Sequence, residues 1–339
     1  MKKIIVFLFV FLINVQRINA SYVVLNQDDN MVIEGSNIHE KRLIASITKV
    51  MTAYIVINNS NLNDIVTVGE EVNQAHGSSI YLVKGEQLTV NDLLYGMILR
   101  SGNDAAIVLA KYVSGSIDEF VKLMNSEVIK LGLKNTVFMN PTGLDDDIKG
   151  NISTAYDMGV ITNLAMKNRI FRKIFKTKHY KCKSNIKSFD WYNKNKTLYN
   201  YKYSTGGKTG YTKKAYRTLI TTATKDNIDL TIVSLNMSDD FNFHKNKYID
   251  IFNKYKKYLI INKYDLNINN KFYKKRKCSF FMKNNYYYLT KKDLLKNLRV
   301  EYVLNKDVSL KNNIIGSAYV YDKNKIVFED PIYLKCIDK

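Results

Sequence analysis

Residues 46–57 read Ser46-Ile-Thr-Lys49-Val-Met-Thr-Ala-Tyr-Ile-Val-Ile57. The run after Lys49 is apolar nearly all round, which predicts a buried central helix. Residues three apart share one face of a helix, so we expect the Lys49 amine beside the Ser46 hydroxyl. A lysine in that position can take the proton of a serine nucleophile. Taken alone, Ser46 is better explained as a helix cap, because serine is a preferred residue at that position.

A second pattern of the same form is Ser184-Asn-Ile-Lys187. It lies within residues 176–202, a stretch rich in Lys, Asn and Tyr. Three apolar residues of this stretch favour an ordered surface excursion over a linker, namely Phe189, Trp191 and Leu198. Only the pattern at Ser46 opens an apolar helix, so it is the better candidate for chemistry.

Two further motifs follow along the chain, Ser101-Gly-Asn103 and Lys208-Thr-Gly210. The order SxxK, SxN, KTG matches the signature of β-lactamases and penicillin-binding proteins, in which the middle element is SDN. Gly102 departs from that version. Each motif also has an ordinary explanation: a polar loop for Ser101, a helix cap for Asn103 and a solvated side chain for Lys208. Because the three motifs occur in this order and in matching context, three independent ordinary explanations together are improbable.

The similarity extends beyond the three motifs and carries a family resemblance. The segments are Ala45-Ser-Ile-Thr-Lys-Val-Met-Thr52, Gly77-Ser-Ser79, Ser101-Gly-Asn-Asp-Ala-Ala106, Asn140-Pro-Thr-Gly-Leu144, Ser153-Thr-Ala-Tyr-Asp157 and Gly206-Gly-Lys-Thr-Gly-Tyr-Thr212. Through them the chain resembles D-alanyl-D-alanine carboxypeptidases, the low-molecular-mass penicillin-binding proteins, over roughly residues 22–260.

The fold class is α/β or α+β, because strand-like and helical runs alternate over residues 21–262. After Lys263, short β-branched and aromatic segments separated by Asn, Lys and Asp predict a small all-β domain over 263–339. Examples are Phe280–Leu289 and Ile326–Leu334. The resemblance implies a β-lactamase/transpeptidase-like catalytic domain with a mainly antiparallel sheet flanked by helices.

The resemblance implies serine acyl transfer at the carbonyl of the penultimate D-alanine of a peptidoglycan stem peptide ending in D-Ala-D-Ala. Ser46 would attack and Lys49 would act as general base, although the identity of the base is disputed in this superfamily. The pKa of Lys49 must then be lowered, and burial and the neighbouring Lys208 cation would both lower it. Ser101 would relay a proton to the leaving amine, and Asn103 would hydrogen-bond the substrate backbone.

The remaining site residues would hold the substrate. Lys208 and Thr209 suit the terminal carboxylate, and the backbone N–H groups of Ser46 and Tyr211 would form the oxyanion hole. Gly210 leaves room for a substrate strand at the sheet edge. Arg217 is a candidate second contact for the carboxylate, or else a surface charge at a strand edge.

Tyr216 stands in Lys214-Ala-Tyr-Arg217, where the family leads us to expect glycine. A tyrosine so close to the catalytic strand either narrows the choice of substrate or points outward.

Two rival functions share these motifs. A β-lactamase must deacylate quickly, and the class A enzymes use a glutamate for that step. No glutamate occurs between Glu127 and Glu301, so we expect penicillin and other β-lactams to acylate the protein persistently and inhibit it. The non-enzymatic alternative is an inactive exported protein of the same fold that binds the cell wall.

Residues 1–20 have the three-part layout of a secretory signal peptide, with cleavage expected after Ala20. Ile18 and Arg17 fit a cleavage site imperfectly, so an uncleaved anchor stays open. We therefore expect an exported protein, in the cell-wall space or on the outer face of the cytoplasmic membrane.

The chain of 339 residues has a formal net charge of +21, and loss of residues 1–20 would leave +18. This charge fits an anionic wall or membrane surface. Export makes nucleic acid an improbable partner, despite the basic stretch Lys271–Lys277. Four histidines and three cysteines show no metal-ligand spacing, and neither a metal nor another cofactor is expected. Cys278 and Cys336 are candidates to pair, with Cys182 left over.

Overall fold

The structure, a computed structural model, describes residues 20–145, 150–270, 278–305 and 313–336. Most of the predicted signal peptide and all of the basic stretch at 271–277 lie outside these ranges. The chain divides into two compact units. The first contains Asn30–Thr222 and Thr231–Phe241 with the residues up to Leu25, and the second contains Asn242–Lys339 with Asn26–Asp29 and Ala223–Leu230. The predicted division after residue 262 stays a prediction.

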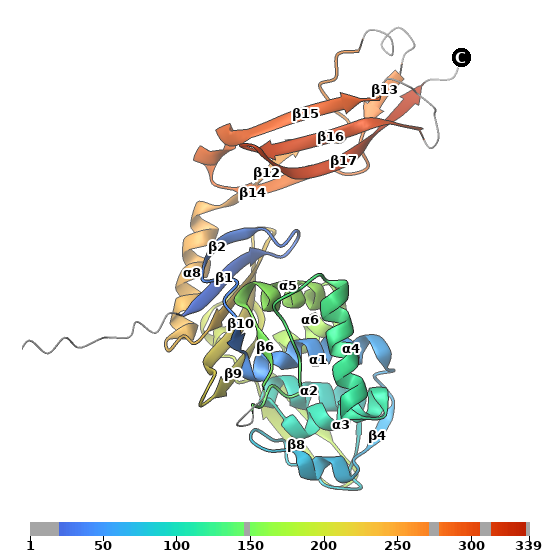
Figure 1. The fold of residues 1–339 in the computed structure, drawn as a ribbon, viewed down its shortest axis with the longest axis vertical. Helices are drawn as coiled ribbons and strands as arrows, with labels where there is room; N and C mark the ends of the chain where they lie inside the picture. The colour runs from blue at the N-terminus through green and yellow to red at the C-terminus, as the bar shows by residue number, and fades with distance from the viewer. Residues whose placement is uncertain (1–19, 146–149, 271–277, 306–312, 337–339) are drawn as a thin grey trace, which may run out of the picture. The chain divides into compact units, whose positions relative to one another are not determined.

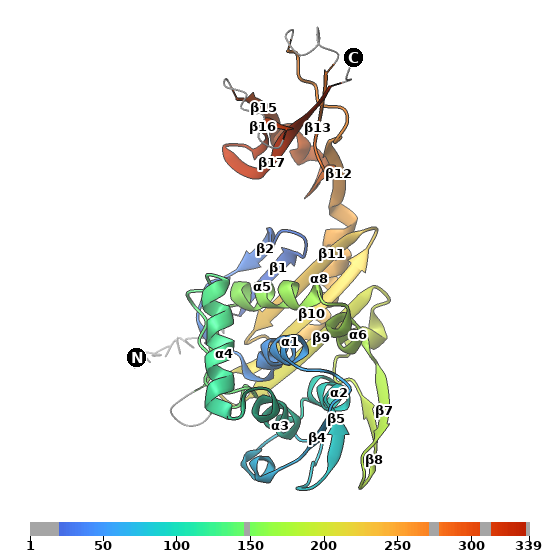
Figure 2. The ribbon, with the colours of Figure 1, turned by 90° about the vertical axis from the view of Figure 1, so that its right-hand side faces the viewer.

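A five-stranded sheet in the order β2-β1-β11-β10-β9 organises the part of the chain that carries the three motifs (Figure 2). Short connections join β9, β10 and β11, which makes them antiparallel neighbours. Asp226 and Asn227 between β10 and β11 both have positive φ, 51° and 60°, as a two-residue type I′ hairpin turn requires. The strands are β1 (Ser21–Asn26), β2 (Val32–Ser36), β9 (Ser204–Thr212), β10 (Tyr216–Lys225) and β11 (Ile228–Leu235).

Helix α1 (Lys49–Asn59) is the predicted central helix, and it lies among five other helices (Figures 1 and 2). Every residue from Lys49 to Ile57 except Tyr54 is buried, which confirms the prediction from its apolar run. Its neighbours are α2 (Val90–Arg100), α3 (Asn103–Ser114), α4 (Ile117–Lys130), α5 (Ala155–Met166) and α6 (Arg169–Lys176). The helix that begins at Lys49 is thus fixed on all sides.

Short elements connect these helices to the sheet. They are β3 (Arg42–Leu43) paired with β6 (Ile152–Ser153), β4 (Ile65–Thr67) paired with β5 (Gln87–Thr89), and the 3-10 helices η1 (Ala45–Thr48) and η2 (Glu70–Gln74). Helix η1 directly precedes α1 and packs against β9. This contact brings the first motif to the strand that carries the third.

The stretch at 176–202 is an ordered excursion, as predicted. It consists of the antiparallel hairpin β7 (His179–Lys183) and β8 (Ser188–Tyr192), followed by the short helix α7 (Thr197–Asn200). Phe189, Trp191 and Leu198 are all buried and anchor it.

Beyond β11 the chain continues with α8 (Asp240–Lys254) and then only strands and one 3-10 helix in the described residues. Strand β12 (Lys256–Ile261) pairs with β14 (Tyr286–Thr290), and a four-stranded antiparallel sheet has the order β13-β17-β16-β15. Its strands are β13 (Cys278–Phe281), β15 (Leu298–Leu304), β16 (Ile314–Asp322) and β17 (Lys325–Cys336), and η3 spans Lys292–Asn297. The run expected at 280–289 is two strands, because Lys283-Asn-Asn285 forms a turn between them.

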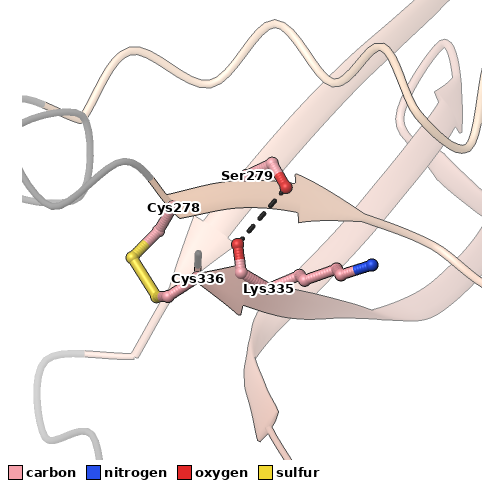
Figure 3. Close-up of a disulfide and its surroundings, with 4 residues drawn as sticks. All are labelled: Cys278, Ser279, Lys335 and Cys336. Atoms are coloured by element: carbon pink, nitrogen blue, oxygen red, sulfur yellow. Dashed lines mark hydrogen bonds between the residues drawn. A yellow bond between two sulfur atoms is a disulfide. The ribbon is translucent and has the colours of Figure 1, made fainter. Parts of the chain in front are cut away.

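Cys278 and Cys336 face each other across β13 and β17 and form a disulfide (Figure 3). The neighbouring Ser279 hydroxyl donates a hydrogen bond to the Lys335 carbonyl at 3.3 Å. The pairing that was a candidate from sequence is therefore present, and Cys182 is a free thiol.

Among the helices of the described residues, none is both long and apolar enough to span a bilayer.

Candidate active site

Ser46 lies in η1, directly before α1, and its hydroxyl is 3.2 Å from the Lys49 Nζ. The residue at the N-cap of α1 is Thr48, and that position has no capping hydrogen bond from a side chain. Ser46 is therefore not the cap of α1. The predicted approach of the two side chains is confirmed, although the turn that produces it is 3-10 rather than α-helical.

Lys49 is completely buried and its amine has two further partners. It donates hydrogen bonds to the Asn103 Oδ1 and to the Thr142 carbonyl, both at 2.6 Å. Burial and, to a smaller extent, the nearby Lys194 cation lower the pKa of Lys49 to about 7, against an opposing effect of Asp104. The burial that we expected is present, Lys194 is a further cation that lowers this pKa, and the repulsion between Lys49 and Lys208 disfavours the charged forms of both.

The loop Asn140–Leu144 holds the Thr142 carbonyl in place. The Asn140 Oδ1 accepts hydrogen bonds from the backbone N–H groups of Thr142 and Gly143 at 3.1 and 2.7 Å. Gly143 has φ +82°, and a Cβ built there would lie 1.9 Å from the Ala45 carbonyl oxygen. Only glycine fits this close approach beside Ser46, which explains the glycine at position 143.

The Ser101-Gly-Asn103 motif is the junction between α2 and α3. Ser101 ends α2 in the left-handed conformation with φ 66°, and Gly102 is the N-cap of α3. Asn103 is the first residue of α3 and is buried, with its amide group donating to the His76 carbonyl at 2.5 Å. Its side chain thus links Lys49 to the loop before Gly77. The predicted contact of Asn103 with substrate stays a prediction.

Asp104 fixes that loop to the start of α3. Its buried carboxylate accepts hydrogen bonds from the Ser79 hydroxyl at 2.5 Å and from the backbone N–H of Leu82 at 3.0 Å. The backbone N–H of Asn103 in turn donates to the Ser78 carbonyl at 2.8 Å. These contacts hold Ser78 in position on the pocket wall.

The KTG motif lies on β9, the last strand in the order of the five-stranded sheet. Lys208 is buried and donates to the Ser101 hydroxyl at 2.9 Å and to the Thr209 carbonyl at 2.7 Å. Burial and the cations of Lys49 and Lys194 keep the pKa of Lys208 well below its ordinary value. A Cβ built on Gly210 would lie 2.9 Å from the Ser46 backbone nitrogen, so glycine permits the approach of β9 to η1.

A pocket of about 330 Å³ opens over these motifs. Arg217 reaches it from β10, with a guanidinium nitrogen 2.6 Å from the Asp240 carboxylate and its guanidinium carbon 5.4 Å from the centre of the Phe241 ring. The residues that line the pocket include three further cations or hydroxyls beyond the predicted set, and no carboxylate. They are Ser46, Ser78, Ser101, Lys194, Lys196, Thr209, Gly210, Tyr211, Arg217 and Phe241.

Tyr216 does not line this pocket and is about half exposed. Its φ of 56° places it in the left-handed region that favours glycine. That backbone conformation is the physical reason for expecting glycine here, and of the two interpretations the structure favours an outward-pointing side chain.

The second SxxK pattern has a structural role in the described residues. Ser184 and Lys187 close the turn of the β7–β8 hairpin, and the Ser184 hydroxyl donates to the buried Glu86 at 2.7 Å. It lies outside the pocket, so its similarity to Ser46 is a coincidence of spacing.

Sequence reasoning assigned no role to Thr142, His76, Asp104, Lys194 or Lys196. The first three of these residues fall in or next to segments that carry the family resemblance, which is the signal that pointed to them. Lys194 and Lys196 carried no such signal, because they lie in a Lys-rich stretch that is typical of solvated surface.

Comparison with known proteins shows the family of this chain. A family model described as D-alanyl-D-alanine carboxypeptidase matches residues 13–239. The D-alanyl-D-alanine carboxypeptidase DacF of Bacillus subtilis is 36% identical over 214 residues, which cover 61% of this chain and 54% of that protein. The chain thus spans little more than half the length of this relative in the match.

Solved structures extend the likeness. Penicillin-binding protein 5 from Haemophilus influenzae superposes with a TM-score of 0.76 at 25% identity, covering 93% of this chain and 96% of that one. A mutant of a Streptomyces DD-transpeptidase superposes with a TM-score of 0.63 at 31% identity, covering 69% of this chain and 95% of that one. Because the family model spans more than half of the chain and includes all three motifs, the chain belongs to the D-alanyl-D-alanine carboxypeptidase family.

Proposed function

We propose that this protein is a serine-type D-Ala-D-Ala carboxypeptidase, which removes the terminal D-alanine from peptidoglycan stem peptides. The observation that carries the proposal is the buried Lys49 amine, 3.2 Å from the hydroxyl of Ser46, which lines the pocket. A lysine whose pKa is about 7 is partly neutral at neutral pH and can accept a proton. No metal or other cofactor enters the proposal.

The proposed reaction is acyl transfer through Ser46. Its oxygen bonds to the carbonyl carbon of the penultimate D-alanine while Lys49 takes the hydroxyl proton. The peptide C–N bond then breaks, and the leaving D-alanine nitrogen receives a proton through Ser101, whose hydroxyl accepts a hydrogen bond from Lys208. Water hydrolyses the resulting ester and regenerates Ser46. In this scheme Asn103 positions the Lys49 amine, in addition to its predicted contact with substrate.

Backbone N–H groups are proposed to stabilise the oxyanion. Those of Ser46 and Tyr211 belong to η1 and β9, and the close approach at Gly210 brings these two segments together. Preorganised donors at such a position lower the barrier because they need no rearrangement as charge develops.

Lys208, Thr209 and Arg217 are proposed to bind the terminal carboxylate. The substrate's negative charge favours the ammonium form of Lys208, whose pKa is otherwise lowered by burial. Arg217 is oriented by Asp240, and its side chain is partly exposed and lines the pocket. Its guanidinium group can therefore donate to an incoming carboxylate.

We further propose that β-lactams acylate Ser46 and that deacylation is slow. The described residues that line the pocket include no carboxylate to activate a hydrolytic water. The protein would act outside the cytoplasm, released after cleavage at Ala20 or tethered by an uncleaved segment, and the high positive charge supports attraction to an anionic wall or membrane surface.

The deciding experiment measures free D-alanine from a stem peptide ending in D-Ala-D-Ala. We expect release by the native protein and loss of at least about 10³-fold in Ser46→Ala, since the covalent route is removed. Ser184→Ala is the matched control, because it alters the second SxxK pattern outside the pocket and should keep its activity.

Labelling by a fluorescent penicillin separates the alternatives. Persistent labelling that vanishes in Ser46→Ala is expected. Rapid turnover of the drug would instead identify a β-lactamase, and a folded protein that neither labels nor releases D-alanine would be a wall-binding protein of the same fold.

A further inference from the structure

The pocket holds more positive charge than a D-Ala-D-Ala terminus needs. That terminus carries one carboxylate, for which Lys208, Thr209 and Arg217 already provide partners. Lys194 and Lys196 also line the pocket, and no described carboxylate lines it. A substrate with a single negative charge would leave both of these ammonium groups without a counterion.

The two lysines are built into the pocket wall. In Asn193-Lys-Asn-Lys196 the asparagines are buried and the lysines are exposed. The Asn193 amide group donates to the Thr177 carbonyl at 3.0 Å, and the Asn195 Oδ1 accepts from the Thr197 hydroxyl at 2.7 Å. The Lys194 N–H donates to the Leu99 carbonyl at 3.1 Å. These contacts fix the backbone of the segment, and both lysines line the pocket.

Neither lysine forms an ion pair with a carboxylate of the described residues. The Lys194 ammonium group has a long hydrogen bond of 3.4 Å to the Ser78 hydroxyl on the pocket wall. The Lys196 ammonium lies 6.0 Å from the centre of the Phe241 ring, a weak contact. Partial burial of its ammonium group and the Arg100 cation lower the pKa of Lys194, so an incoming anion would relieve unfavourable charge there.

We propose that Lys194 and Lys196 bind a second carboxylate of the stem peptide, so that the site selects peptides whose third residue carries a free carboxylate. This inference rests on the proposed carboxypeptidase function. The leaving D-alanine has only its terminal carboxylate, so the second one must belong to the acyl part of the substrate. A diamino acid with a free carboxylate, such as diaminopimelate, meets this requirement, whereas its amide or lysine at that position does not.

The test compares two pentapeptides that differ only in whether the third residue is diaminopimelate with a free carboxylate or with its carboxamide. For the native protein we expect kcat/KM for D-alanine release to be about fivefold to tenfold higher for the acid, the size of one solvent-exposed charge-assisted contact. The preference should shrink as ionic strength rises, because exposed charges are screened.

Lys196→Gln is the informative variant, since Lys194 also acts on the pKa of Lys49. We expect the acid-to-amide ratio to fall to about one through loss on the acid peptide alone, and Lys196→Arg to keep the ratio. Lys178→Gln is the matched control on the same excursion, outside the pocket, and should leave the ratio unchanged.

Equal rates on the acid and amide peptides for the native protein would overturn the inference. An equal loss on both peptides in Lys196→Gln would also overturn it, because it would place Lys196 at the terminal carboxylate. Release of D-alanine from neither peptide by a folded protein would refute the proposed function itself, an outcome distinct from the other two.

Discussion

Two buried lysines dominate the site at the scale of single residues. The Lys49 amine is hydrogen-bonded to the Ser46 hydroxyl, and the Lys208 amine to the Ser101 hydroxyl. Both lysines are removed from water and close to other cations, which disfavours their charged forms. The low pKa that a lysine base requires is therefore a property of its surroundings.

The pH dependence of D-alanine release should follow Lys49. A general base must be neutral, and lysine is neutral above its pKa, so kcat/KM should rise with pH up to about 7 and then level off. Removing a neighbouring cation raises a lysine pKa, so Lys194→Gln should move the inflection to higher pH. Lys122→Gln, an exposed control, should not move it. An inflection that stays in place in Lys194→Gln would contradict the electrostatic account.

Gly143 tests the close approach of the loop to Ser46. In Gly143→Ala the added Cβ collides with the Ala45 carbonyl, so we expect loss of about 2 kcal/mol in the free energy of unfolding and a fall of about 10²-fold in kcat/KM. Gly132→Ala is the control, because φ there is +67° and nothing lies within 4 Å. It should lose about 1 kcal/mol of stability with normal kcat/KM. Equal kcat/KM in both variants would reject the steric explanation.

At the scale of elements, the site exists because two helix starts and one strand converge. Helix η1 presents Ser46, the junction of α2 and α3 presents Ser101, and β9 presents Lys208. The packing of η1 on β9 sets the distance between the first and third motifs. Two of the three reacting groups thus lie on turns and junctions rather than in the bodies of helices, as is common for sites on a rigid scaffold.

The first residue of β10 carries avoidable strain. Tyr216 has φ 56° and an exposed side chain, so Tyr216→Gly should raise the free energy of unfolding by about 0.5–1 kcal/mol in a denaturant titration. Its kcat/KM should be unchanged, because the side chain does not line the pocket. Lys213→Gly in the same turn is the control and should lose stability. A change in substrate choice in Tyr216→Gly would support the alternative interpretation of this residue.

At the scale of the whole molecule, the pocket residues all belong to the first compact unit. The strands that follow α8 form sheets with a core of their own, which includes Ile315, Val320 and Ile332. The disulfide connects strands of that second unit only. The pocket and the disulfide thus belong to different units.

Removal of the disulfide tests this separation. Cys278→Ser with Cys336→Ser should lower the stability of the second unit by about 2–4 kcal/mol, since a crosslink with a sequence separation of 58 restricts the unfolded chain. The kcat/KM for D-alanine release should not change. Cys182→Ser is the control for loss of a thiol. Loss of activity in the double variant, with Cys182→Ser unaffected, would show that catalysis depends on the second unit.

The sequence by itself determined the features that local geometry controls. The spacing of three between Ser46 and Lys49 places the two side chains together in any helical turn, and an apolar run predicts its own burial. Alternation and turn residues likewise predicted the β-rich character of the C-terminal segment, and the motif order predicted the family. These signals need no knowledge of distant parts of the chain.

Only the tertiary structure decided which distant groups surround the lysines. Lys194 helps to lower the pKa of Lys49, and the Thr142 carbonyl and Asn103 complete the contacts of its amine. The ion pair between Arg217 and Asp240 likewise could not be predicted from the sequence. These groups are separated along the chain and meet through packing of helices on a sheet. A lysine in a Lys-rich stretch can be assigned a role only when the fold places it at a pocket.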